Sequence, residues 1–225
     1  MTYPKQPKDS IPESATPTLP IGASLSQITA LVGSTVDGQR PIPPVDQWNP
    51  KFCGTMNLQV KSNGEWWHEG SKINREPLIR LFSSVLWREG DDYFLKTPVE
   101  KIQIQVDDVP LLVNSIDQVS VDFGTNIETD VETGIKAETK VGAKTYLRCT
   151  TKTGDVVIVD AAHPIFMRDY EGEARPYIRV RWDLEALIQR SAFYHLISYG
   201  EFVERDGHSL VALRSGDFEF EISAD

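Results

Sequence analysis

A strict alternation of apolar and polar residues, repeated in short runs along the chain, constrains the fold more than any other feature. Met56, Leu58 and Val60 alternate with polar residues, and similar runs are centred on Ile104 and on Phe220. Because successive side chains of a strand point to opposite faces of a sheet, each run predicts a strand with one buried face and one wet face. The chain is therefore expected to be rich in β-sheet.

The first alternating run is followed by a turn signal and a second short run. Asn63-Gly64 lies between the run that ends near Val60 and the residues Trp66, Trp67 and His68. An Asn-Gly pair supplies the two positive-φ residues of a tight hairpin turn. We therefore predict a β-hairpin in which Trp66 and Trp67 face opposite sides, so that one ring lies outside the first core and needs a neighbour.

A helix is predicted after this hairpin. Beyond the candidate N-cap Asn74, apolar residues recur at helical spacing from Leu78 to Leu86, and Pro77 is tolerated in a first turn. Gly90 is expected to end the helix.

A second helical region is predicted near the C-terminus. Asp183 is its candidate cap, Leu184, Leu187 and Ile188 share one face at helical spacing, and Gly200 is expected to end it. Three alternating segments follow, which predict a terminal β-meander.

The N-terminal segment has a different composition. Residues 1–50 hold nine of the fourteen prolines, and a stretch so rich in Pro, Ser and Thr buries too little apolar surface to order itself. Residues 1–44 are therefore interpreted as a flexible Pro-rich arm. Residues 24–33 have helical spacing, which fits either a short docking helix or a transient helix.

Together these patterns predict an α+β protein. We expect two small β-sheet subdomains, roll-like or barrel-like, each with a packed helix, at residues 45–110 and 111–225. The acidic stretch 117–142 is predicted to be a strand that leads into a long hairpin or loop. Both halves run hairpin, helix, hairpin, and Leu78-Ile79 before Gly90 in the first is weakly echoed by Leu187-Ile188 before Gly200 in the second. Gene duplication is one explanation, but any small α+β unit that packs a helix on a sheet produces similar patterns.

Net charge and hydropathy limit the classes of partner that the protein is expected to bind and its expected cellular location. The net charge of −10 and the absence of a Lys/Arg run disfavour a nucleic-acid partner. No apolar run reaches the roughly 20 residues of a membrane helix, and the first residues do not resemble a secretory signal. Cys53 and Cys149 are far apart and form no CxxC pair, so a reducing cytoplasm fits best.

Motifs for catalysis, phosphate binding and metal binding are absent from the sequence. It has no glycine-rich phosphate loop, HExxH helix, GxSxG elbow or EF-hand. No two of the four histidines, His68, His163, His195 and His208, have the local spacing of metal ligands. We therefore predict no catalytic residue, no metal and no cofactor.

Several longer motifs resemble a known bacterial family. The run GEWWHEGSKINREPLIRLFSSVLWREGDDYFLKTPVEKIQIQVDDVPLLV, with DQWNPKFCG before it and TTKTGDVVIVDAAHPI and YIRVRWDLEALIQRSAFYHLI after it, resembles Domain of Unknown Function 1285. The resemblance covers residues 45 to about 220. It implies a two-part α+β protein without an established activity, for which a regulatory or signalling role has been suggested.

One group of charged and aromatic residues is the candidate ligand site. It comprises Trp66, Arg75, Arg80, Glu100, Lys101 and Asp107. Guanidinium groups beside an indole ring suit a small anion or a carboxylate-bearing ligand. The alternative is that the same charges are ion pairs that hold helix to sheet. Asp107 and Asp108 are adjacent on a strand, point to opposite faces and cannot share a proton.

Trp87 is the candidate interface residue. It lies off the apolar stripe of the predicted helix, and a homodimer would bury it.

Three functional hypotheses follow. The first is a non-enzymatic cytoplasmic module that binds a small ligand or a protein partner and acts in regulation or signalling. The second is a small hydrolase or lyase whose acid/base site gathers Glu100, Asp107, His68 and His163. The third is a dimeric structural scaffold.

Overall fold

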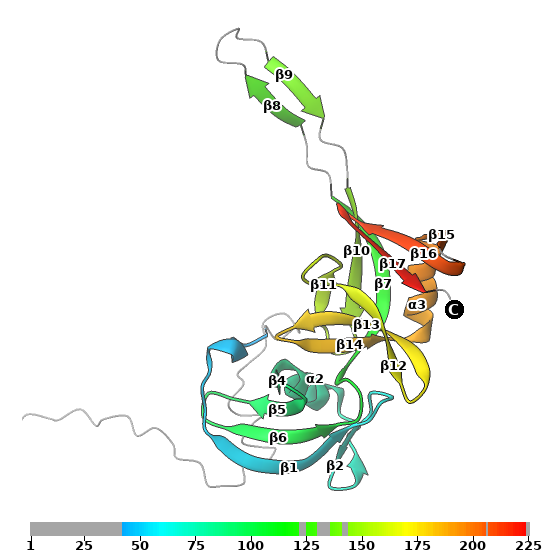
Figure 1. Ribbon diagram of the computed structural model, residues 1–225. Coiled ribbons are helices and arrows are strands. Elements are labelled where there is room, and N and C mark those ends of the chain that lie inside the picture. The colour runs from blue at the N-terminus through cyan, green and yellow to red at the C-terminus, as the bar shows by residue number, and fades with distance from the viewer. Residues whose placement is uncertain (1–41, 122–124, 130–135, 141–143, 206, 224–225) are drawn as a thin grey trace, which may run out of the picture.

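The computed structural model describes residues 42–121, 125–129, 136–140, 144–205 and 207–223 (Figure 1). Nearly all of the predicted arm, including residues 24–33 for which a short helix is predicted, lies outside the described residues. The described chain begins beside a short 3-10 helix, η1 (Val45–Gln47), whose Val45 is fully buried.

The first half forms a six-stranded mixed sheet in the order β3-β2-β1-β6-β5-β4. Its first and last strands in sequence, β1 and β6, lie side by side and parallel, whereas the other neighbours are antiparallel. Helix α2 (Glu76–Ser84) connects the two halves of this sheet. The strands are β1 (Phe52–Val60), β2 (Trp66–His68), β3 (Ser71–Lys72), β4 (Leu86–Glu89), β5 (Asp92–Lys96) and β6 (Lys101–Val106).

The predicted hairpin between β1 and β2 is confirmed, but its turn is of another type. Gly64 has a φ of 81°, whereas Asn63 does not have a positive φ. The Gly64 amide donates to the Lys61 carbonyl, and the Asn63 side chain accepts a hydrogen bond from the Glu65 amide. A type I turn followed by a left-handed glycine results, because the Asn63 side chain stabilises the turn without a left-handed backbone.

Helix α2 is shorter than predicted. It starts after Arg75 rather than Asn74 and ends at Ser84. The following residues form strand β4, and Gly90 (φ 61°) turns that strand into β5. The prediction failed because Val85 and Leu86 continue the helical spacing, although Val85 is the C-cap of α2 and Leu86 is the buried first residue of β4.

The second half repeats this arrangement of strands. Its six-stranded sheet has the order β11-β10-β7-β14-β13-β12, and the first and last strands in sequence, β7 and β14, are again parallel neighbours. The strands are β7 (Leu111–Val121), β10 (Lys144–Thr151), β11 (Val156–Ile158), β12 (Ile165–Tyr170), β13 (Glu173–Arg181) and β14 (Leu184–Ile188).

Between β7 and β10 the chain forms a further hairpin. Its strands are β8 (Thr125–Thr129) and β9 (Lys136–Lys140), and Figure 1 shows them projecting away from the rest of the molecule. The predicted strand and hairpin of the acidic stretch are therefore both present.

The second helix lies later than predicted. Residues Leu184–Ile188 are strand β14, and helix α3 (Arg190–Ser198) begins only after Gln189. Trp182 and Asp183 both have positive φ, so Asp183 belongs to the β13–β14 turn and caps no helix. Leu184, Ala186 and Ile188 are buried at the spacing of a strand, which places β14 between β13 and β7.

The predicted terminal meander is confirmed as a third sheet. It consists of β15 (Glu201–Arg205), β16 (His208–Ser215) and β17 (Phe218–Ser223). The α+β prediction, with two sheets and a helix for each, is confirmed as well. The proposed sequence echo between Leu78-Ile79 and Leu187-Ile188 is wrong, because the first pair is helical and the second lies in a strand.

The buried residues of both halves form one continuous cluster. In the first half, the Trp66 ring stacks on Phe82 of α2 at a centroid distance of 6.0 Å. Leu147, Ile178 and Leu196 continue the cluster through the second sheet and α3. The two sheets are thus held against each other by apolar packing.

Candidate functional site

The residues of the sequence-predicted ligand site do not converge in the structure. Trp66 is 2% exposed and lies in the core. Arg75 and Arg80 are exposed at the start and on the outside of α2, and among the described residues neither has an ion pair. The indole ring therefore lies in the core, whereas both guanidinium groups face solvent.

The acidic members of the predicted group are also separated. Glu100 precedes β6 and Asp107 follows it, so the strand places them about 20 Å apart. Glu100 is 6% exposed, and burial raises the pKa of its carboxyl. Asp107 accepts a hydrogen bond from Gln59 at 2.7 Å and pairs with Lys61 at 3.8 Å.

Lys101 has a structural partner as well. Its ammonium pairs with Glu89 of β4 at 2.8 Å and lies 4.9 Å from the centre of the Phe94 ring. The Lys101–Glu89 pair reaches across β5 to join β6 to β4, and the contacts of Asp107 join the ends of the neighbouring strands β6 and β1. Both agree with the alternative that these charges hold structural elements together.

The tryptophans of the two sheets lie in different environments. Trp87 is on β4, not on a helix as predicted, and its ring contacts Trp182 of the second half at 6.1 Å. Lys96 lies 3.9 Å from the centre of the Trp87 ring. Trp66 and Trp67 face opposite sides as predicted, since Trp66 is buried and the half-buried Trp67 donates from Nε1 to Glu65.

The groups of the hydrolase hypothesis do not contact one another. Within the described part of the chain, no hydrogen bond or ion pair joins any two of His68, His163, Glu100 and Asp107. His163 instead contacts Asp160 at 3.0 Å. Burial favours a higher pKa for Asp160, but hydrogen bonds from the His163 and Ala162 amides and the His163 ring outweigh it and lower that pKa.

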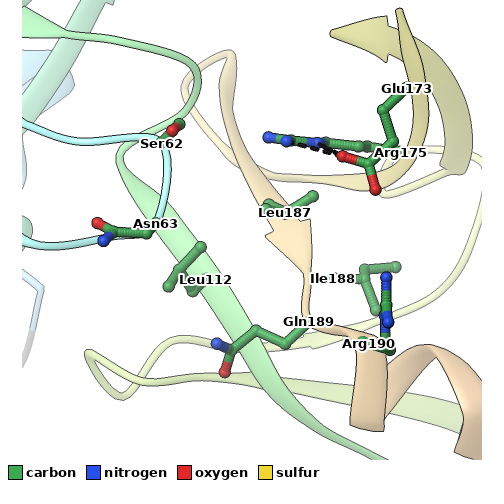
Figure 2. A pocket seen from close by; sticks show the side chains of 9 residues that line it. All are labelled: Ser62, Asn63, Leu112, Glu173, Arg175, Leu187, Ile188, Gln189 and Arg190. Carbon is green, nitrogen blue, oxygen red and sulfur yellow. Dashed lines mark hydrogen bonds and ion pairs between the residues drawn. The ribbon is translucent and has the colours of Figure 1, made fainter. Parts of the chain in front are cut away.

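A cleft of about 360 Å³ lies between the β1–β2 turn and the segment where β14 passes into α3 (Figure 2). In Figure 2, Ser62 and Asn63 line one side and Glu173 and Arg175 the other, with Leu112 and Leu187 between them. The full lining is Ser62, Asn63, Leu112, Glu173, Arg175, Leu187, Ile188, Gln189 and Arg190. We call this space the junction cleft.

The floor of the junction cleft is apolar and is set by strand pairing. Leu112 of β7 and Leu187 of β14 are direct partners in the parallel pair, so their side chains lie next to each other. The β1–β2 turn closes over Leu112 because Gly64 has no side chain, and a Cβ at Gly64 would clash with Leu112. Gly64 thus permits both the turn and the close approach of the two halves.

The rim of the junction cleft carries a held arginine. Arg175 binds Glu173 through Nε at 2.9 Å and through Nη2 at 2.8 Å, and its Nη1 lies 3.6 Å from Asp108. The Asp108 side chain is 2% exposed and also accepts hydrogen bonds from Tyr177 at 2.8 Å and from Arg168 at 3.3 Å. Arg175 is therefore fixed in position by a buried carboxylate.

The pKa of Tyr177 reflects the charges behind the rim of the junction cleft. Burial, together with the hydrogen bond to the Asp108 carboxylate, raises the pKa of Tyr177 to about 12. The hydroxyl consequently stays protonated and donates to Asp108 throughout the physiological range.

The other end of the junction cleft is positive and less fully paired. Arg190 is the first residue of α3, is exposed and forms no ion pair within the described residues. Gln189, the N-cap, makes no side-chain capping bond, and the first turn of α3 has no acidic residue. An arginine beside uncapped amide groups attracts a small anion.

The sequence prediction missed this cleft. Its residues come from four separate segments, and none of them belongs to a recognisable binding motif. The available signal was that Leu112 and the segment 187–190 fall inside runs that carry the family resemblance.

No helix in the described part of the chain is long and apolar enough to cross a membrane. Among the same residues, no group of three or more His, Cys, Asp or Glu side chains is placed to hold a metal ion.

Comparisons with known proteins identify the family. Residues 43–109 match the family model described as domain of unknown function (DUF1285), N-terminal domain, and residues 131–222 match the C-terminal domain of the same family. No curated protein matches the chain.

Two crystal structures are similar to this chain. A DUF1285 family protein from Silicibacter pomeroyi DSS-3 is 33% identical, with a TM-score of 0.69 over 89% of this chain and 94% of that chain. A second DUF1285 family protein, from Shewanella baltica OS155, is 22% identical, with a TM-score of 0.41 over 64% of this chain and 91% of the other. From its two matching domains and its 33% identity to the first relative, the chain belongs to the DUF1285 family.

Proposed function

We propose that this protein is a ligand-binding module whose junction cleft takes a small amphipathic carboxylate. The observation that carries the proposal is an apolar floor next to an arginine that has no ion-pair partner among the described residues. Small-molecule sites combine apolar walls with a few placed polar groups, and their volumes begin near 300 Å³.

The division of roles follows from the contacts. Leu112, Leu187 and Ile188 suit a short hydrocarbon body, while Arg190 and the first amides of α3 suit its carboxylate. Arg175 is already neutralised by Glu173 and Asp108, so its part is to limit the length and direction of the ligand.

The acidic charge of the whole chain makes the positive charge of Arg190 more significant for anion binding. With a net charge of −10, the surface on average repels anions. Because Arg175 is neutralised by Glu173 and Asp108, Arg190 supplies the positive charge of the cleft, and selectivity for an anion would depend on it. A binding module without chemistry of its own fits a regulatory or signalling role, in which the occupied cleft changes how the two halves meet.

Thermal unfolding tests the proposal. We would measure Tm with a panel of sodium salts, including butyrate, hexanoate, succinate and chloride, at constant ionic strength. A ligand at 100 times its Kd adds about 2.7 kcal/mol, which raises Tm by about 5 to 11 °C in a chain of this size. We expect hexanoate or butyrate to raise Tm more than chloride does.

Two arginine variants make the test specific. Arg190→Ala removes the charge at the cleft, whereas Arg80→Ala removes an exposed helical arginine from the site that the sequence suggested. We expect the carboxylate effect to disappear in Arg190→Ala and to persist in Arg80→Ala. The proposal is wrong if Arg80→Ala alone loses the effect, or if no carboxylate exceeds chloride.

A further inference from the structure

A second hollow lies on the outer face of the first sheet, away from the junction cleft. It has a volume of about 380 Å³ and is lined by Asn57, Gln59, Lys61, Trp67 and Gly70. Gln59 of β1 and Trp67 of β2 are direct cross-strand partners, so the amide and the ring lie next to each other on this face. Leu58 and Val60, which alternate with Gln59, are fully buried on the opposite face.

The groups that line this hollow are held by carboxylates around it. Trp67 donates from Nε1 to Glu65 at 3.2 Å, and Glu65 in turn binds Lys72 at 2.5 Å. Gln59 donates to Asp107 at 2.7 Å. The ring and the amide are therefore oriented before any ligand arrives, which reduces the entropy that binding costs.

A second amide is held in the same way. Asn57 donates to Glu69 at 3.4 Å, and Gly70, which follows Glu69, has a φ of 73° and opens the edge of the hollow. Among the described residues, the oxygen and the second N–H of each side-chain amide have no partner, so each amide presents an acceptor and a donor.

The charges around the hollow disfavour ionic ligands of either sign. Glu65, Glu69 and Asp107 surround it and repel an anion. A cation gains little over Trp67, because Lys61 itself lines the hollow and pairs with Asp107, and Lys72 already neutralises Glu65. A neutral ligand is the remaining class.

We propose that this hollow binds a neutral saccharide stacked on Trp67, with its hydroxyl groups bound by Asn57 and Gln59. A pyranose has an apolar C–H face that packs on an indole ring, and its hydroxyls both donate and accept, as the two amides do. A nucleobase has two π faces and is bound best between two rings, whereas Trp67 is the single aromatic residue that lines this hollow in the described chain.

Fluorine NMR tests the proposal on the intact chain. The protein would be labelled with 5-fluorotryptophan, and the resonance of Trp67 among the five tryptophans would be assigned with Trp67→Phe. The probes are cellotriose, maltotriose and methyl glucoside, with glucuronate, glucosamine and adenosine as charged and planar comparisons. A shallow site of this kind binds with a Kd of about 1 mM.

We expect at least one neutral sugar to shift the Trp67 resonance saturably, and glucuronate and glucosamine to bind more weakly. Gln59→Ala should weaken binding about two- to tenfold through one lost hydrogen bond. Gln103→Ala is the matched control, because Gln103 lies on β6 outside the lining and binds Asp92.

Two results would overturn the saccharide site. One is that no neutral sugar shifts the Trp67 resonance. The other is that glucuronate, glucosamine or adenosine binds as well as the best neutral sugar. Arg190→Ala should leave sugar binding unchanged, which separates this site from the junction cleft.

Discussion

Removing Arg181 should cost far more stability than removing an exposed arginine of the same sheet. Arg181 ends β13 and forms an ion pair with Asp155, and its Nη2 donates to the Ser83 carbonyl at 2.6 Å. Ser83 lies in the last turn of α2, so a single side chain joins the helix of the first half to the second sheet. The side chains of Arg181 and Asp155 are only 12% and 6% exposed.

The magnitude follows from this burial. Arg181→Met leaves the Asp155 carboxylate with two threonine hydroxyls and no cation. Losing one partner of a buried pair costs about 3 to 5 kcal/mol. We expect about 3 kcal/mol, at the lower end, because the buried Nε of Arg181 has no partner among the described residues and already costs stability in the native protein.

An exposed pair provides the control. Arg148 and Asp117 form an ion pair at 2.6 Å across β10 and β7, but their side chains are 44% and 36% exposed. Arg148→Met should therefore cost about 0 to 1 kcal/mol. Both variants would be compared by urea unfolding followed by tryptophan fluorescence and circular dichroism, with the slope of the transition checked for constancy.

A double variant completes the test. Arg181→Met with Asp155→Asn removes both charges, so it should be more stable than Arg181→Met alone by more than about 1 kcal/mol. The reasoning would be refuted if Arg181→Met cost no more than Arg148→Met, or if the double variant were no more stable than the single one.

Three further predictions concern stability. Gly64→Ala should destabilise the protein by more than Gly172→Ala, which has a similar φ of 84° but open space around it; urea unfolding of both checks this. Burial raises the pKa of Glu100. The stability that its protonated carboxyl contributes is therefore fully present below the unfolded pKa near 4.5 and is lost as pH rises through the folded pKa. The free energy of unfolding of Glu100→Gln, relative to that of the wild type, should therefore be higher at pH 7 than at pH 4. An equal difference at the two pH values would contradict this. Tyr177→Phe should cost about 1.5 to 3 kcal/mol through its bond to Asp108, and should remove the phenol that titrates near pH 12 in absorbance.

The strands with one wet face could be predicted from sequence. Leu58 and Val60 in β1 and Ile102 and Ile104 in β6 are buried as their alternation indicates. Alternation is a local pattern, and it directly reports which side chains of a strand are removed from water. For this reason β1, β6 and the terminal meander were predicted near their observed bounds.

Two strands were mistaken for helix because short apolar segments satisfy both periods. Helical spacing fits Leu184, Leu187 and Ile188, whereas the spacing of a strand fits Leu184, Ala186 and Ile188. In the structure the whole segment Leu184–Ile188 is strand β14. The choice depends on the neighbours β7 and β13, which supply the backbone hydrogen bonds of a central strand. No local pattern contains those neighbours.

The chain's own pattern of apolar residues, glycines and charges determined the fold class, most strands and the presence of a helix in each half. The order of strands, the junction cleft and the partners of every charged group were decided by the folded protein. Ser62, Leu112, Arg175 and Arg190 meet because β7 pairs in parallel with β14 and the β1–β2 turn closes on Leu112. Contacts between residues so far apart depend on which strands pair, and that is settled by the total burial and hydrogen bonding of the whole chain.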